Sequence, residues 1–162
     1  MNDNLGKKAE HKLRIWLDRP DIGQSFDRIY DQMSGFYGGR NICDFILFKS
    51  PYMFYIESKA TTHDRFDFSM LTDTQYQGLL SKSKIQNVFG VVIVLFYEYK
   101  RAFVFNIVDI NKLYQLGKKS LNINKISRWN IPYYEIPTIS SRKELLDYNG
   151  NVEDIVKSLS NT

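Results

Sequence analysis

Cysteine and histidine are scarce in this sequence of 162 residues, which contains one cysteine and two histidines. A single cysteine, Cys43, excludes a disulfide within the chain and suits a reducing cytosol. Neither His11 nor His63 is close to Cys43 in sequence, so we interpret Cys43 as a small buried apolar residue rather than a nucleophile. A lone histidine makes a poor metal site, and His63 is interpreted as polar surface.

Long apolar runs are also missing. The longest extends from Val88 to Tyr99 and is interrupted by Gly90 and Glu98, whereas a helix that crosses a bilayer needs about 20 apolar residues. The first ten residues, MNDNLGKKAE, are polar and charged, unlike a signal peptide. We therefore expect a cytoplasmic protein that has no membrane partner.

No strong excess of one charge is present. The net charge of +4 and the pI of about 9.0 permit a polyanionic partner without requiring one. The composition, 43% hydrophobic, excludes a disordered chain. The length fits one domain with a real core, and we expect a single domain over residues 1–162, without repeats or linkers.

Apolar periodicity predicts a mixed sheet flanked by helices. The expected strands cover residues 41–48, 53–61, 88–97 and 102–108. The expected helices cover residues 5–17, 26–33, 72–84, 109–116 and 152–159. The polar, basic segment 117–130 is predicted to be a loop.

Three charged residues interrupt the first two predicted strands: Asp44, Glu57 and Lys59. If the turn between these strands centres on Ser50 and Pro51, facing residues have numbers that sum to 101, which places Asp44 opposite Glu57 on one face. Lys59 points to the same face, because side chains alternate along a strand. A register shift of one residue would separate the two carboxylates.

Two carboxylates this close repel each other unless a proton or a cation lies between them. Mg²⁺ prefers oxygen ligands, and Asp44, Glu57 and the Ser58 carbonyl would supply three. Glu10, at the border of the first helix's apolar stripe, could approach as an outer or second-metal ligand. Lys59 could orient an attacking water or stabilise charge on phosphorus. The alternative is a structural ion pair, since Glu-x-Lys is a common sequence.

The pattern of Glu10, then Asp44, then Glu57-Ser58-Lys59 resembles the PD-(D/E)xK nuclease superfamily. Cys43 stands where the motif's proline is expected. The resemblance implies an α/β fold with a restriction-endonuclease-like core, in which helices flank a mixed central β-sheet. It also implies a DNA nuclease with Mg²⁺ as cofactor, for which Mn²⁺ can substitute.

Within this superfamily the chain is similar to the RecU-type Holliday-junction resolvases of Gram-positive bacteria and their phages. The segments that carry the similarity are DF, IESKAT, DTQYQGLL and VFGVVIVLF. The resemblance implies a homodimer that resolves four-way DNA junctions by paired phosphodiester hydrolysis; a phage member would act in the host cytoplasm. It also implies a catalytic glutamine at the start of the third helix, for which Gln75 is the best match and Gln77 the second.

The interval between Glu10 and Asp44 is shorter than the resemblance leads us to expect. Residues 21–40 would then form a reduced version of the stalk that enters the junction. Phe36 and Tyr37 in this segment are candidates to stack on opened bases, or to pack against the sheet. The basic candidates for phosphate contact are Lys8, Lys12, Arg40, Lys82 and Lys84.

Two other functions stay open at this point. The chain could be another PD-(D/E)xK endonuclease, of the restriction or repair type. It could also be a nucleic-acid-binding module that keeps the fold without catalysis, although the intact Asp44, Glu57 and Lys59 argue against this.

Overall fold

A computed structural model describes residues 3–30, 40–139 and 147–160 of the chain. Its helices are α1 (Asp3–Leu17), α2 (Asp73–Lys82), α3 (Ile107–Gln115) and α4 (Val152–Ser160). A sheet of six strands is built from β1 (Ser25–Arg28), β2 (Phe45–Lys49), β3 (Tyr52–Thr61), β5 (Val88–Phe96), β6 (Arg101–Asn106) and β8 (Tyr134–Glu135). Two small pairings join β4 (Arg65–Asp67) to β7 (Ser120–Asn122) and β9 (Thr138–Ile139) to β10 (Asp147–Tyr148).

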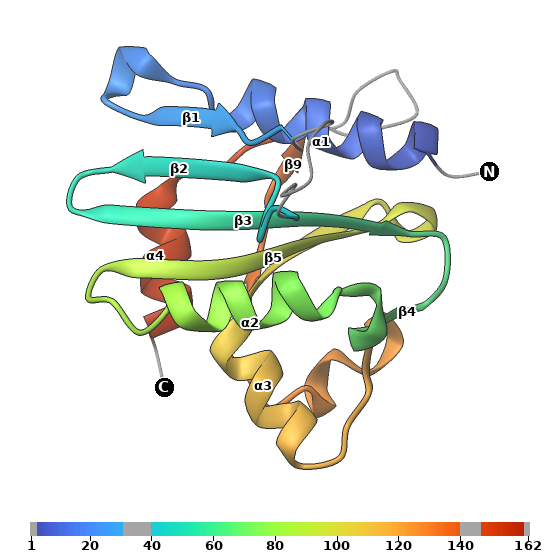
Figure 1. The fold of residues 1–162 in the computed structure, drawn as a ribbon. Helices are drawn as coiled ribbons and strands as arrows, with labels where there is room; N and C mark the ends of the chain where they lie inside the picture. The colour runs from blue at the N-terminus through green and yellow to red at the C-terminus, as the bar shows by residue number, and fades with distance from the viewer. Residues whose placement is uncertain (1–2, 31–39, 140–146, 161–162) are drawn as a thin grey trace.

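The large sheet is mixed and has the order β1-β2-β3-β5-β6-β8. Strands β3 and β5 are parallel, and the other neighbours are antiparallel. A parallel pair needs a crossover connection, and α2 lies within this one. The predicted α/β fold, a mixed central sheet with helices on its faces, is therefore confirmed (Figure 1).

Apolar side chains cover both faces of the sheet. One core lies between the sheet and α1 and α4, and the other lies between the sheet and α2 and α3; Figure 1 shows α2 and α3 in front of the sheet and α4 behind it. Strand β5 is buried between the two cores, which explains its unbroken apolar sequence. Among the described residues, no helix has the length and apolar character to span a bilayer.

The β2–β3 hairpin has the predicted register, because Phe45 pairs with Ile56 and Lys49 pairs with Tyr52. The ladder changes at its end. If the register continued, Asp44 would face Glu57. Instead, the Asp44 N–H donates to the carbonyl of the preceding residue, Ile56, at 3.0 Å. Asp44 thus lies just outside β2, and the strand predicted over residues 41–48 begins only at Phe45.

The helix predicted over residues 26–33 is wrong where the structure describes it. Residues Ser25–Arg28 form β1, an edge strand paired with β2. Phe26 is buried and stacks on Phe45 with ring centroids 4.7 Å apart, while its neighbours Ser25 and Asp27 are exposed. This alternation of buried and exposed residues has the period of a strand, and tertiary stacking on Phe45 decides the conformation. Residues 31–33 of the predicted helix lie outside the described residues.

The loop predicted over residues 117–130 is also corrected. It contains β7 and the 3-10 helix Ile123–Arg128. Leu121, Ile123 and Trp129 are buried against the core that faces α2 and α3. These three apolar residues anchor a segment whose other residues are mostly polar.

Gly90 allows α2 to lie against β5. A Cβ at this position would be 2.5 Å from the backbone oxygen of Leu79 in α2, so the helix would have to move. We predict that Gly90→Ala lowers the free energy of unfolding by about 2 kcal/mol, measured by urea denaturation. Gly6→Ala in α1 is the control, because its Cβ meets no atom within 4 Å and alanine favours a helix. Equal stability of Gly90→Ala and wild type would contradict the close packing.

Candidate active site

The charged residues of the hairpin meet where β2 begins and β3 continues past it. Lys59 Nζ lies 3.0 Å from Glu57 Oε1, and Gln75 Nε2 donates to that same oxygen at 2.8 Å. The Ser58 N–H donates to Asp44 Oδ2 at 2.9 Å. The structure therefore brings together five of the predicted site residues, four from the hairpin and one from α2.

Gln75 reaches Glu57 because of the way α2 begins. Thr72 caps the helix: its hydroxyl accepts the Gln75 N–H at 3.2 Å, and Gln75 Oε1 accepts the Thr72 N–H at 3.0 Å. This is a capping box, which the sequence TDTQ encodes locally. Because the amide oxygen is fixed by the cap, the amide nitrogen is oriented towards the Glu57 carboxylate.

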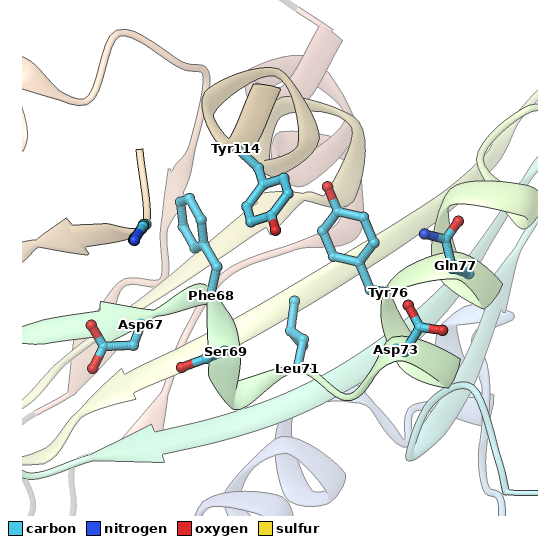
Figure 2. Close-up of a pocket in the computed structure, with 9 residues that line it drawn as sticks. Asp67, Phe68, Ser69, Leu71, Asp73, Tyr76, Gln77 and Tyr114 are labelled. Carbon is cyan, nitrogen blue, oxygen red and sulfur yellow. The ribbon is translucent and has the colours of Figure 1, made fainter. Parts of the chain in front are cut away.

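Gln77, the second candidate for the catalytic glutamine, lies elsewhere. Its side chain lines a cavity of about 550 Å³ together with Tyr76 of α2 and Tyr114 of α3. Figure 2 shows this cavity, with the two tyrosines and Phe68 around it. Of the two glutamines, Gln75 is thus the one that contacts a carboxylate of the candidate site.

Glu57 is almost fully buried, with 2% of its surface exposed. Its pKa is raised to about 8, first by burial and then by the nearby carboxylate of Asp44, whereas the ammonium of Lys59 acts in the opposite direction. The contact with Lys59 does not offset these two effects. The second carboxylate oxygen, Oε2, is buried without a hydrogen-bond partner. Such an atom is costly unless another group binds it.

The pKa of Asp44 is also raised. Burial raises its pKa, the hydrogen bond from the Ser58 N–H opposes this rise, and the charge of Glu10 adds to it. Lys59 and Arg28 lower the pKa of Asp44 by their positive charges. Asp44 is therefore within electrostatic reach of both Lys59 and the Glu10–Arg28 pair.

Glu10 itself is bound by a residue that sequence reasoning did not single out. Arg28 Nη1 contacts Glu10 Oε2, and this contact raises the pKa of Arg28. Arg28 was missed because its segment has helical spacing of apolar residues; recognising β1 as a strand would have placed it opposite Phe45, next to Asp44. The role of Glu10 as an outer metal ligand stays a prediction.

The donor set can be compared with the needs of a hard divalent cation. Among the described residues, no group of three or more His, Cys, Asp or Glu side chains is gathered to hold a metal ion. The available oxygens are those of Asp44 and Glu57, with Glu57 Oε2 lacking a partner. The Ser58 carbonyl faces the same strand edge as its N–H, which bonds Asp44. Two carboxylates, one carbonyl and water molecules fit a cation such as Mg²⁺.

The other predicted residues are more scattered. Lys12 pairs with Asp147, on a different side of α1 from Glu10, and Lys82 Nζ lies 5.3 Å from the ring centroid of Tyr55. Cys43 is buried, which raises its pKa to about 12 and agrees with a structural role. Lys8, Arg40 and Lys84 are exposed. Phe36 and Tyr37, with the other residues of segment 31–39 in the proposed stalk, lie outside the described residues.

Comparison with known proteins gives one family. The family model RecU, described as Recombination protein U, matches residues 25–153, a range that includes Asp44, Glu57, Lys59 and Gln75. Among solved structures the chain is similar to Hjc of Archaeoglobus fulgidus, described as a Holliday junction resolvase from an archaeal hyperthermophile. The identity is 14%, the match covers 75% of this chain and 99% of that chain, and the TM-score is 0.48. No curated protein sequence matches.

The buried carboxylate gives a prediction for stability in the absence of metal. Glu57 has a pKa near 4.5 before folding and of about 8 in the fold. Between these values the folded protein keeps a proton that the unfolded chain has lost, so the free energy of unfolding falls as pH rises. We predict that wild type loses about 3 kcal/mol between pH 5 and pH 8 relative to Glu57→Gln, by urea denaturation in EDTA.

The matched control is Glu98→Gln, at an exposed position. Its stability should follow that of wild type across the same pH range. Parallel pH curves for Glu57→Gln and wild type would show that Glu57 is ionised in the metal-free fold.

Proposed function

The chain belongs to the RecU family, and from this membership we propose that it resolves four-way DNA junctions by metal-dependent hydrolysis of phosphodiester bonds. The observation that carries the proposal is a pair of carboxylates, the buried Glu57 and the partly buried Asp44, on adjacent chain segments at the start of the hairpin. Lys59 and Gln75 both contact one oxygen of Glu57, which leaves its other oxygen for a cation.

Asp44, Glu57 and the Ser58 carbonyl are proposed to hold the cation, with Mg²⁺ as the natural ion and Mn²⁺ as a substitute. When bound, it would neutralise charge on the phosphate and make a water more acidic. Gln75 fixes the rotamer of Glu57 through its 2.8 Å hydrogen bond. Asp44 is oriented in the same way by the Ser58 N–H. Both carboxylates are therefore pre-positioned, which limits the reorganisation needed for binding.

Lys59 is proposed to act on the reacting phosphate. Its side chain is 18% exposed and its ammonium is held 3.0 Å from Glu57, so it has one fixed anchor and one side that can reach substrate. A fixed cation stabilises the negative charge that develops on phosphorus more strongly in a partly dry site than in water. Orienting the attacking water is the other role that we propose for it.

Paired cuts require two matched sites. A C₂ homodimer supplies them with one kind of interface, and we propose a homodimer that binds branched DNA as the working assembly. Light scattering of the free protein and of its junction complex measures the copy number. A single copy on the junction would count against paired cleavage.

A different endonuclease of the same superfamily is the second candidate, since the same catalytic residues would serve it. Cleavage of a linear duplex, a flap and a four-way junction of equal length separates the two. Preference for the junction supports resolution, whereas equal or greater cleavage of the duplex supports a restriction or repair role.

Replacing one carboxylate tests the site directly. We predict that Asp44→Asn binds a synthetic four-way junction but cleaves it about a thousandfold more slowly than wild type in Mg²⁺, because a metal contact of several kcal/mol is lost. The measurement is a time course on labelled junctions, with EDTA as the metal-free reference. Asp27→Asn, at an exposed position of β1, should cleave normally. Wild-type rates for Asp44→Asn would show that the site is assigned wrongly.

A further inference from the structure

A groove of about 390 Å³ lies beside the candidate active site, between α1 and the end of β1. Its walls carry three basic residues, a histidine and two aromatic rings: Lys7, Arg14, Arg28, His11, Tyr30 and Phe45. Glu10 also borders it. We propose that this groove is a second phosphate site, which binds a backbone phosphate next to the scissile one on the cleaved DNA strand. The proposal rests on the proposed function and names the part of the substrate that the groove recognises.

The charge of the groove selects an anion. Lys7, Arg14 and Arg28 are cations at neutral pH, and Glu10 is the one carboxylate among the lining residues. Because Arg28 already pairs with Glu10, the charges of Lys7 and Arg14 are the ones left for a ligand. DNA binds more tightly to such a local excess of positive charge, because each phosphate that a lysine or arginine neutralises releases a counterion.

Lys7 and Arg14 lie along one face of α1, with Glu10 and His11 between them. Residues 7, 10, 11 and 14 follow the helical repeat, and the opposite face buries Ala9, Leu13 and Trp16 in the core. Lys7, His11 and Arg14 are exposed. The cations therefore do not depend on α1 moving in order to reach DNA.

Arg28 lines the groove, and its contacts hold its side chain in place. Its guanidinium carbon lies 5.6 Å from the ring centroids of both Tyr30 and Phe45, while Glu10 binds Nη1. Arginine stacked in this way keeps further N–H groups that can donate to a phosphate. Tyr30 is 70% exposed, so its ring and hydroxyl are open to a ligand.

The groove is continuous with the candidate active site through the β1–β2 ladder. Arg28 pairs with Phe45, and the Ile29 N–H donates to the Asp44 carbonyl at 2.8 Å. The electrostatic influence of Glu10 and Arg28 reaches Asp44. A DNA strand whose scissile phosphate lies at Asp44 would thus present a neighbouring phosphate to the groove.

Two exposed cations of the groove provide the test, because their replacement spares the core. We expect Arg14→Gln to weaken binding of a four-way junction about tenfold, and Lys7→Gln to act in the same direction. Each should reduce the slope of log Kd against log salt by about one unit. Lys157→Gln in α4 is the control: it removes an exposed lysine that does not line the groove. Unchanged affinity and slope in Arg14→Gln and Lys7→Gln would overturn the proposal.

A substrate series locates the phosphate. Junctions with one uncharged methylphosphonate at successive positions of the cleaved strand are titrated with wild type and Arg14→Gln. At the phosphate bound by the groove, the two losses should not add, whereas elsewhere they should add. Additive losses at every position would contradict a defined site and indicate diffuse attraction alone.

Cleavage by wild type, measured on the unmodified junction, keeps the two proposals apart. If wild type cuts while Arg14→Gln binds as wild type does, the groove assignment is wrong and the resolvase function stands. If wild type does not cut but binds DNA with an Arg14-dependent affinity, the function is wrong and the groove stands. If wild type neither binds nor cuts, both are wrong.

Discussion

The mutual repulsion of a buried carboxylate, Glu57, and a partly buried one, Asp44, is the constraint on which the site depends. Asp44 and Glu57 lie on neighbouring segments, Glu57 is buried and Asp44 partly so, and burial is the largest cause of the raised pKa of each. In water these groups would separate or stay solvated. Here the hairpin holds them, because the apolar residues that flank the two charges, Cys43, Phe45 and Ile56, are buried in the cores of the sheet. The fold thus keeps a local concentration of negative charge that a cation can relieve.

The neighbouring elements serve this arrangement from two directions. On one face α2 contributes Gln75, whose amide closes the helix cap with one end and binds Glu57 with the other. This helix lies close to the sheet because Gly90 carries no side chain. On the other face α1 contributes Glu10 and the exposed cations of the groove, joined to Asp44 through Arg28 and β1. The helices therefore determine the chemistry of the hairpin as well as covering it.

Sequence reasoning reached the parts of the site that local signals encode. The hairpin register followed from the turn and the alternation of residues, and the start of α2 followed from its capping residues. The helix predicted over residues 26–33 was wrong because Phe26 stacks on Phe45, a contact between distant residues that the apolar spacing does not reveal. Arg28 was missed for the same reason, and the pairing of Lys12 with Asp147, from the far end of the chain, was not foreseen. Periodicity identifies the faces of an element but not the partner that each face meets.

The mixture of antiparallel and parallel pairing in the sheet has a consequence for the order in which the site can assemble. Strands β2 and β3 are joined by a tight turn, and bringing Asp44 beside Glu57 closes only a short stretch of chain. The β3–β5 ladder joins Met53 to Val88 across the whole crossover that contains α2, so its closure costs more chain entropy. We therefore expect the hairpin contacts that pair the carboxylates to form first. The contacts of the crossover, which bring Gln75 to Glu57, are expected to form later. A nascent chain would carry its repelling charges before it carries the residue that orients them.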